Sequence, residues 1–164
     1  MIKDGKLIFK IEQIAISPPE SGPAMDLLKD IGATEWSVDT VVAEGSVFGD
    51  YASNKAELNF NYDVCEGKEF EVLKYIGGPN WISASVGNYP CVSHFGMHCD
   101  AQELYLWKQF FAKKQIRIAQ EVHTISHTNP VIKDKRKYHY TIFATRHLIG
   151  VDLKFIVRMD QPQP

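Results

Sequence analysis

The order of apolar and polar residues along the chain predicts a protein built mainly of β-strands. The clearest signal covers residues 56–64, where Leu58, Phe60 and Tyr62 fall on one face and polar residues fill most positions between them. Because successive side chains of a strand point to opposite faces, this period of two indicates a strand with one buried face. Apolar and β-branched runs predict seven further strands, over residues 7–17, 38–43, 68–76, 92–99, 116–126, 138–145 and 151–158.

Two segments instead repeat their apolar residues at helical spacing. The first begins near Ser21, a candidate N-cap residue, and ends at Gly32. The second begins after Asp100, with Glu103 three positions later at the spacing of a capping box, and continues to Phe111. The apolar stripe of this second helix indicates packing against a core.

The predicted elements occur in the same order twice. Residues 7–76 contain a strand, a helix and three strands, and residues 92–158 repeat this βαβββ order. The intervening segment, residues 77–91, is rich in glycine, proline and asparagine, which is typical of a linker. We therefore expect one α+β domain over residues 1–164, in which paired βαβββ modules form an open mixed β-sheet with a cleft between them.

Composition narrows the classes of partner and location. With 164 residues, 45% of them hydrophobic, the chain is long enough to bury one core. A formal net charge of -2 argues against nucleic-acid binding, and no run of about 18 apolar residues indicates a membrane span. Cys65, Cys91 and Cys99 form no CxxC pair and the first residues lack a secretory signal, so we expect a cytoplasmic protein.

Three short motifs place polar side chains at matching points of the two modules. In each, one polar residue of a predicted strand precedes two or three apolar residues. The motifs are Gln13-Ile14-Ala15-Ile16, Glu71-Val72-Leu73 and His94-Phe95-Gly96-Met97. Together with the element order over roughly residues 8–158, they resemble the vicinal oxygen chelate superfamily, which includes glyoxalases, extradiol dioxygenases, fosfomycin-modifying enzymes and bleomycin-binding proteins.

This resemblance implies a site for a divalent metal ion, such as Zn, Ni, Mn or Fe, with Gln13, Glu71 and His94 as ligands. An amide oxygen, a carboxylate and an imidazole suit such an ion and leave positions open for substrate. The family's fourth ligand falls at Lys154, and an ammonium cannot ligate a metal. Asp152, two residues earlier on the same strand face, is the alternative carboxylate.

Each of these residues also has a simpler interpretation. Gln13 and Glu71 would then face solvent, and His94 would be a hydrogen-bonded interior histidine. Lys154 would form a same-face pair with Asp152, or its positive charge would replace the missing ion and hold an anionic substrate or enolate without a metal.

The histidines supply further candidates for proton transfer, because imidazole titrates near neutral pH. His98 lies on the same strand face as His94 and is a candidate substrate contact or general acid. His139, between Tyr138 and Tyr140, is a candidate for lining the cavity, and His127 falls in a turn from which it would reach toward the cleft. The candidate catalytic set is therefore His98, His139 and Lys154.

Two functions follow from the resemblance. The first is a metal-dependent enzyme of the glyoxalase or dioxygenase type, a lyase, isomerase or dioxygenase acting on a small oxygen-rich molecule. The alternative is a non-catalytic binding protein of the bleomycin-resistance kind, with an aromatic groove lined by Trp36, Trp81, Trp107 and the tyrosines. In both cases the resemblance implies a homodimer that binds a small molecule. A domain that keeps only the fold is the third possibility.

Overall fold

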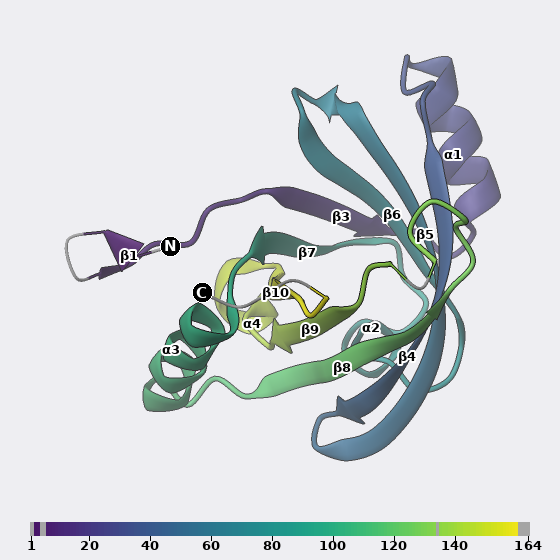
Figure 1. Cartoon of the computed structure of the whole chain (residues 1–164). Coiled ribbons are helices and arrows are strands. Elements are labelled where there is room, and N and C mark those ends of the chain that lie inside the picture. Colours follow the sequence, from purple (N-terminus) through teal and green to yellow (C-terminus); the bar gives the residue numbers. More distant parts are fainter. Residues whose placement is uncertain (1, 4–5, 134, 161–164) are drawn as a thin grey trace.

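The computed structural model describes residues 2–3, 6–133 and 135–160 (Figure 1). Eight of its strands form a closed barrel. They are β3 (Gln13–Ser17), β4 (Ser37–Val47), β5 (Asp50–Cys65), β6 (Lys68–Gly77), β7 (Cys91–His98), β8 (Ile118–His127), β9 (Tyr138–Phe143) and β10 (Asp152–Arg158). The helices are α1 (Ser21–Asp30), α2 (Trp81–Ser85), α3 (Ala101–Lys113) and α4 (Arg146–Ile149), and β1 (Ile2–Lys3) pairs with β2 (Lys6–Leu7) ahead of the barrel.

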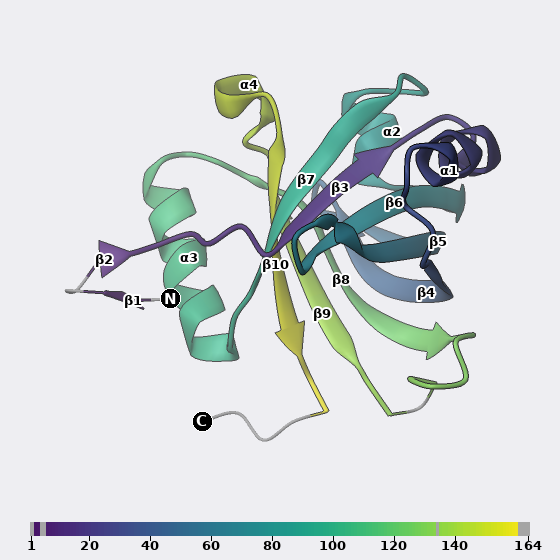
Figure 2. The same ribbon diagram turned by 90° about the horizontal axis from the view of Figure 1, so that it is seen from above.

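The strand order around the barrel is β10-β7-β3-β6-β5-β4-β8-β9, and Figure 2 shows these strands from above. In each half of the chain the first strand pairs in parallel with the last, β3 with β6 and β7 with β10. The two halves meet twice, through the antiparallel pairs β3–β7 and β4–β8. The predicted fold class, a mixed α+β protein of repeated βαβββ order, is confirmed.

The sheet is closed, whereas the sequence predicted an open cleft. Closure requires β4 to approach β8, and Gly45 is the residue that permits this approach. A side-chain carbon at Gly45 would lie 2.1 Å from the carbonyl oxygen of Glu121 on β8. Only glycine leaves room for this contact, so Gly45 allows β4 to pair with β8 and close the barrel.

The hairpin of β4 and β5 is longer than the predicted strands over residues 38–43 and 56–64. The two strands extend toward each other and are joined by Phe48 and Gly49, whose φ angles are 49° and 94°. Two residues with positive φ match the right-handed twist of a hairpin. Gly49 therefore marks a tight turn inside the hairpin and not a break between separate elements.

The long helices lie outside the barrel on different sides of it (Figures 1 and 2). α1 packs Met25 on Phe70 of β6, and α3 packs Trp107 and Phe111 on Phe155 of β10. Since successive side chains alternate between faces, the outward position of Phe155 leaves its neighbour on each side directed into the barrel. Since α3 covers Phe155 outside the barrel, Lys154 beside it can point into the interior.

The predicted helix starts are partly correct. Asp100 caps α3 by accepting a hydrogen bond from the backbone N–H of Glu103. Ser21, in contrast, is the first residue of α1 rather than its cap, and its hydroxyl instead donates to the carboxylate of Glu57 on β5. The segment expected to be a linker contains α2, which buries Trp81 in the barrel. None of the helices in the described part of the chain has the length and apolarity of a membrane span.

Candidate functional site inside the barrel

Four neighbouring strands direct polar side chains to one point inside the barrel. Gln13 comes from β3, Glu71 from β6, His94 from β7 and Lys154 from β10. The parallel pairs have the same register, because Gln13 lies opposite Glu69 and His94 lies opposite Asp152. Glu71 and Lys154, two residues further along their strands, therefore occupy equivalent positions in the two halves.

These four side chains are in contact and buried. The His94 Nε2 atom lies 2.8 Å from Gln13 Oε1 and 3.2 Å from Glu71 Oε2. The Lys154 ammonium lies 3.5 Å from the same Glu71 oxygen. Glu71 and His94 are 0% exposed, Gln13 2% and Lys154 7%. The interpretation in which Gln13 and Glu71 face solvent is therefore wrong.

A small residue in each motif makes room for the polar side chain of the other half. Across β3 and β7, Gln13 lies opposite Gly96 and His94 lies opposite Ala15. A side-chain carbon at Gly96 would lie 2.8 Å from Gln13 Oε1 and 2.9 Å from Gln13 Cβ. The third residue of each motif is thus small because the partner motif's functional side chain passes over it.

The charges of the cluster follow from burial and contact. Burial raises the pKa of the Glu71 carboxyl, but the Lys154 ammonium and the hydrogen bond from His94 outweigh it and lower that pKa below its ordinary value. Burial and the neighbouring ammonium lower the pKa of His94 to about 4. At neutral pH the imidazole is therefore uncharged, and its Nε2 carries the proton because both of its partners are oxygens.

Glu69 belongs to the same cluster, although the sequence motifs did not identify it. Its carboxylate accepts hydrogen bonds from the Gln13 amide and, at 3.1 Å, from the Tyr62 hydroxyl. Burial and the charge of Glu71 raise the pKa of Glu69. The available signal was its spacing of two from Glu71, which places both carboxylates on the same face of β6.

The cluster does not fit a divalent metal ion as it stands. Gln13, Glu71 and His94 converge, but the ammonium of Lys154 occupies the fourth position and already pairs with the Glu71 oxygen. Two like unit charges 4 Å apart repel by about 4 kcal/mol at an effective dielectric constant of about 20, and a divalent ion doubles this repulsion. The three predicted ligands also supply a single carboxylate, that of Glu71, whose charge the ammonium neutralises.

Asp152, the alternative carboxylate ligand, is committed elsewhere. Its Oδ2 accepts hydrogen bonds from Trp81 Nε1 and Arg146 Nε, both at 3.2 Å, and its Oδ1 accepts one from the backbone N–H of Arg146. Asp152 therefore ties α2 and α4 to the barrel and does not complete a metal site. The same contacts exclude the expected pair between Asp152 and Lys154.

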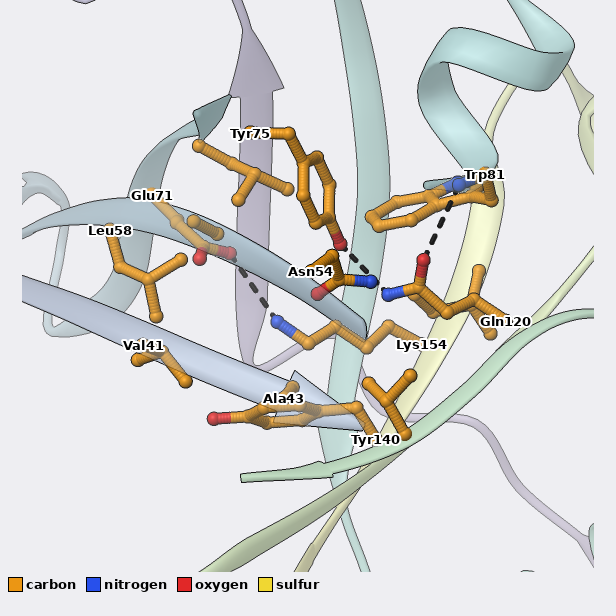
Figure 3. A pocket seen from close by; sticks show the side chains of 14 residues that line it. Val41, Ala43, Asn54, Leu58, Glu71, Tyr75, Trp81, Gln120, Tyr140 and Lys154 are labelled. Atoms are coloured by element: carbon orange, nitrogen blue, oxygen red, sulfur yellow. Dashed lines mark hydrogen bonds and ion pairs between the residues drawn. The ribbon is translucent and has the colours of Figure 1, made fainter. Parts of the chain in front are cut away.

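Lys154 lies where two cavities meet. The inner cavity encloses about 400 Å³ and is lined by Glu71, Tyr75, Trp81 and Lys154 among largely apolar neighbours (Figure 3). Figure 3 shows the Lys154 ammonium pointing toward the Glu71 carboxylate. The outer cavity encloses about 660 Å³ and has polar walls, with both Lys154 and Tyr140 shared between the two cavities.

The outer cavity contains several titratable side chains. Those that line it are Asp39, Tyr62, Glu69, His98, His127, Arg136, Tyr138, Tyr140 and Lys154. The cavity therefore offers both cations and proton acceptors to a small molecule.

The structure separates the histidines predicted from the sequence. His127 is buried in the wall of the outer cavity, as its turn suggested. His98 lies at the rim of that cavity, half exposed, with its ring 3.3 Å from the Glu12 carboxylate. His139 points out of the barrel and lies 2.8 Å from Glu121, so the expectation that it lines the cavity is corrected. Tyr138 and Tyr140 take the inward positions on either side of it.

The three tryptophans do not form a common groove. Trp81 lines the inner cavity, whereas Trp36 packs on Phe70 and Trp107 lies in the aromatic cluster beneath α3. Tyrosines line both cavities, Tyr75 and Tyr140 the inner one and Tyr62, Tyr138 and Tyr140 the outer one.

Comparison with solved structures gives matches over nearly the whole chain. Methylmalonyl-CoA epimerase from Mycobacterium tuberculosis matches with a TM-score of 0.51 and 11% identity, over 97% of this chain and 94% of that chain. A hypothetical protein from Bacillus halodurans C-125 matches with a TM-score of 0.49 and 11% identity, over 94% and 98% of the two chains. Methylmalonyl-CoA epimerase from Streptomyces coelicolor matches with a TM-score of 0.47 and 12% identity, over 90% and 95%.

No protein-family model matches the sequence, and no curated protein is similar to it. At 11% identity a structural match establishes the fold and not the activity. The chain therefore shares its fold, a mixed α+β arrangement with a closed β-sheet, with methylmalonyl-CoA epimerase.

Proposed function

We propose that this protein is an enzyme that moves a proton on a small, anionic, oxygen-rich molecule, and that Lys154 supplies the positive charge in place of the metal ion that the resemblance implies. The observation that supports this proposal is the position of Lys154. Its ammonium is buried at the junction of the two cavities and occupies the position equivalent to Glu71. A cation fixed in a site of this kind stabilises negative charge that develops on a bound oxygen.

The proposed step is removal of a proton from a carbon next to a carbonyl group. The C–H bond breaks, its electron pair moves to form an enolate, and the negative charge that appears on the carbonyl oxygen is paired with the Lys154 ammonium. Glu71 holds this ammonium in place through their ion pair. No oxidant or reductant is needed, since the proton is the only species transferred.

Glu69 is the proposed proton acceptor. It lines the outer cavity together with Lys154, and its pKa is raised by burial and by Glu71. A carboxylate with a raised pKa is a stronger base near neutral pH than an exposed one. The hydrogen bonds from Gln13 and Tyr62 fix its orientation.

A metal-dependent form of the same chemistry is the version that the resemblance implies. It would use Gln13, Glu71 and His94 as ligands and would require the Lys154 ammonium to leave. We favour the form without metal because the ammonium and its Glu71 partner already satisfy one another inside the barrel. Melting temperatures with and without Zn, Ni, Mn or Fe(II) distinguish the two forms, since a metal ligated by the cluster stabilises the fold.

One observation favours the alternative of a binding protein without turnover. The rings of Tyr138 and Tyr140 are stacked, with centroids 5.8 Å apart and planes within 11°, and both line the outer cavity. Such a wall binds flat ligands by stacking, whether or not a reaction follows. The two functions differ in whether a bound acid exchanges its hydrogens with solvent.

The test uses pyruvate, 2-oxobutyrate and acetoacetate in D₂O, with loss of the proton signal followed by NMR. We expect at least one acid to raise the melting temperature of the protein and to exchange its protons. Glu69→Gln should abolish exchange and keep binding. The double variant Glu71→Gln/Lys154→Met, which removes both charges of the ion pair, should lose binding.

Lys108→Met is the matched control, because Lys108 is likewise paired with a glutamate, Glu121, but lines neither cavity. It should leave binding and exchange unchanged. Binding without exchange in the wild type would favour the binding protein. If none of the three acids binds or exchanges, the proposed function is wrong.

One chain closes the barrel by itself, so the proposed site needs no second copy. The homodimer implied by the resemblance remains a proposal, and light scattering on the purified protein would test it.

A further inference from the structure

A second buried pair of ionisable side chains lies in the outer cavity, apart from the cluster around Glu71. Asp39 comes from the start of β4, and His127 is the last residue of β8. The Nδ1 atom of His127 lies 2.7 Å from Oδ2 of Asp39. Asp39 is 2% exposed and His127 6%, and both line the outer cavity.

The surroundings of Asp39 fix the roles of the two imidazole nitrogens. Its Oδ1 accepts hydrogen bonds from the backbone N–H groups of Thr128 at 3.2 Å and Asn129 at 2.9 Å. With both of these donors on Oδ1, Oδ2 is the oxygen that faces the imidazole and accepts a hydrogen bond from it. Nδ1 of His127 is therefore the protonated nitrogen, and in the neutral imidazole Nε2 carries the free lone pair.

That lone pair has no partner in the described part of the chain. Nε2 of His127 is buried without any hydrogen bond, although the ring lies in a cavity wall. The nearest aromatic ring, Tyr138, lies with its centroid 6.2 Å away at 64° and packs against the imidazole. A buried acceptor that lacks a donor is destabilising, so a donor carried by a ligand in the cavity would gain this hydrogen bond at little further cost.

We propose that the Asp39–His127 pair is the site that recognises a hydroxyl group of the ligand and accepts its proton, and that the ligand is therefore a hydroxy acid. This inference rests on the proposed function in one respect: the anionic end of the molecule is paired with Lys154, which lines the same cavity. The hydroxyl donates to Nε2. When the proton moves, the O–H bond breaks, its electron pair stays on the oxygen, and the new imidazolium is paired with Asp39.

His127 would thus contact the ligand, whereas Asp39 would act through His127 as a positioning residue. Asp39 selects the tautomer whose acceptor nitrogen is free and offsets the charge that arrives with the proton. Any carboxylic acid can pair with Lys154, but only an acid with a hydroxyl at the right distance satisfies Nε2. The pair therefore distinguishes hydroxy acids from acids without the hydroxyl.

The first test needs no ligand and no variant. The ¹⁵N NMR spectrum of the wild-type chain, with labelled histidine side chains, reports which nitrogen of His127 is protonated. We expect Nδ1 protonated and Nε2 free, with the population shifted toward the Nε2–H form in Asp39→Asn. A wild-type His127 with its proton on Nε2 overturns the inference, whatever ligands do.

The second test compares glycolate, 3-hydroxypropionate and 4-hydroxybutyrate with acetate, propionate and butyrate. The three chain lengths sample different distances between the Lys154 ammonium and His127 Nε2. We expect one hydroxy acid to bind roughly tenfold more tightly than its partner without the hydroxyl, which is the contribution of one hydrogen bond. The same acid should shift the Nε2 resonance of His127.

The variant His127→Phe, which keeps a planar ring, should remove this preference and leave binding of acetate, propionate and butyrate unchanged. His123→Phe is the matched control, because His123 lies on the same strand with an exposed side chain and should keep the preference. A preference that survives His127→Phe, or hydroxy acids that never shift Nε2, overturns the inference.

The two proposals fail differently. If acetate, propionate and butyrate bind equally to the wild type and to Glu71→Gln/Lys154→Met, the proposed function is contradicted. If binding of these acids depends on Lys154 but hydroxy acids bind no more tightly, only the role of His127 is contradicted.

Discussion

The Gln13 side chain occupies the space that any side chain at Gly96 would need. The two residues face each other across β3 and β7, the strands that join the two halves of the chain. The Gln13 amide, held in this space, accepts from His94 through its oxygen and donates to Glu69 through its nitrogen. The lack of a side chain at Gly96 thus allows the two halves to share a polar cluster.

Gly96→Ala should therefore destabilise the protein and disturb the cluster. The new methyl group would meet Gln13 Oε1 at 2.8 Å, and adding a carbon to a packed interior costs about 1–3 kcal/mol. Urea unfolding followed by circular dichroism would measure this loss. Gly22→Ala is the control, because Gly22 lies in α1 with no atom within 4 Å of the added carbon, and alanine there should stabilise by about 0.5–1 kcal/mol. Equal unfolding midpoints for the wild type and Gly96→Ala would contradict this account of the motif.

The ion pair between Glu71 and Lys154 should be costly to break from one side only. Lys154→Met leaves the fully buried Glu71 carboxylate without its counter-ion, and removing one partner of such a pair costs about 3–5 kcal/mol. Glu71→Gln/Lys154→Met removes both charges and should be more stable than Lys154→Met alone. Denaturant unfolding of the two variants measures the difference. A single variant as stable as the double would show that Glu71 is not held as an anion.

The sequence predicted the part of the site that depends on local motifs. Gln13, Glu71 and His94 each precede an apolar run, and the fold implied by the resemblance brings them together. The Lys154 position followed from the same resemblance. The four side chains converge because strand pairing in a repeated βαβββ order leaves few arrangements for the chain.

The rest of the site depends on which face of a strand turns inward, and this is poorly determined where both faces are polar or aromatic. His139 illustrates the point, because a shift of one residue exchanges it with Tyr138 or Tyr140. Asp39 was missed although it alternates with the apolar Val41 on β4, which is the signal of an inward carboxylate. Closure of the barrel also lay beyond the sequence, since it follows from the contact of Gly45 with β8.

Stability should fall in mildly acidic solution because His94 is buried uncharged. Burial and Lys154 lower the pKa of His94 from 6.5 to about 4, so between these values the unfolded chain binds a proton that the folded chain does not. The contribution of His94 is complete above pH 6.5 and is lost as the pH falls toward 4, by at most about 3 kcal/mol.

Urea unfolding of the wild type and of His94→Gln, measured from pH 4 to 7.5, isolates this effect. Glu69 has a raised pKa and contributes with the opposite sign in both proteins, so the difference between the two curves belongs to His94. The wild type should lose more stability than the variant as the pH falls from 6.5 to 4. Parallel curves would show that His94 is charged, or solvated, in the folded protein.

Replacing the ammonium by a carboxylate should convert the cluster into a metal site. Lys154→Glu supplies the acidic fourth residue that the resemblance implies and places it beside Glu71. In the wild type the Glu71 oxygen lies 3.5 Å from the Lys154 ammonium. Without metal the two carboxylates repel one another, so the variant should unfold at a lower temperature than the wild type. With Gln13 and His94 the carboxylates form a donor set that suits Zn, Ni, Mn or Fe(II). Added metal at 100 times its dissociation constant should then stabilise the variant by about 2.7 kcal/mol.

The wild type should show no such gain from added metal, because its Lys154 ammonium repels the ion. Lys154→Gln, which removes the charge without adding a carboxylate, separates loss of repulsion from gain of a ligand. Metal stabilisation of the wild type equal to that of Lys154→Glu would show that Lys154 does not replace the ion, and a metal-dependent mechanism would then be the better description of this site.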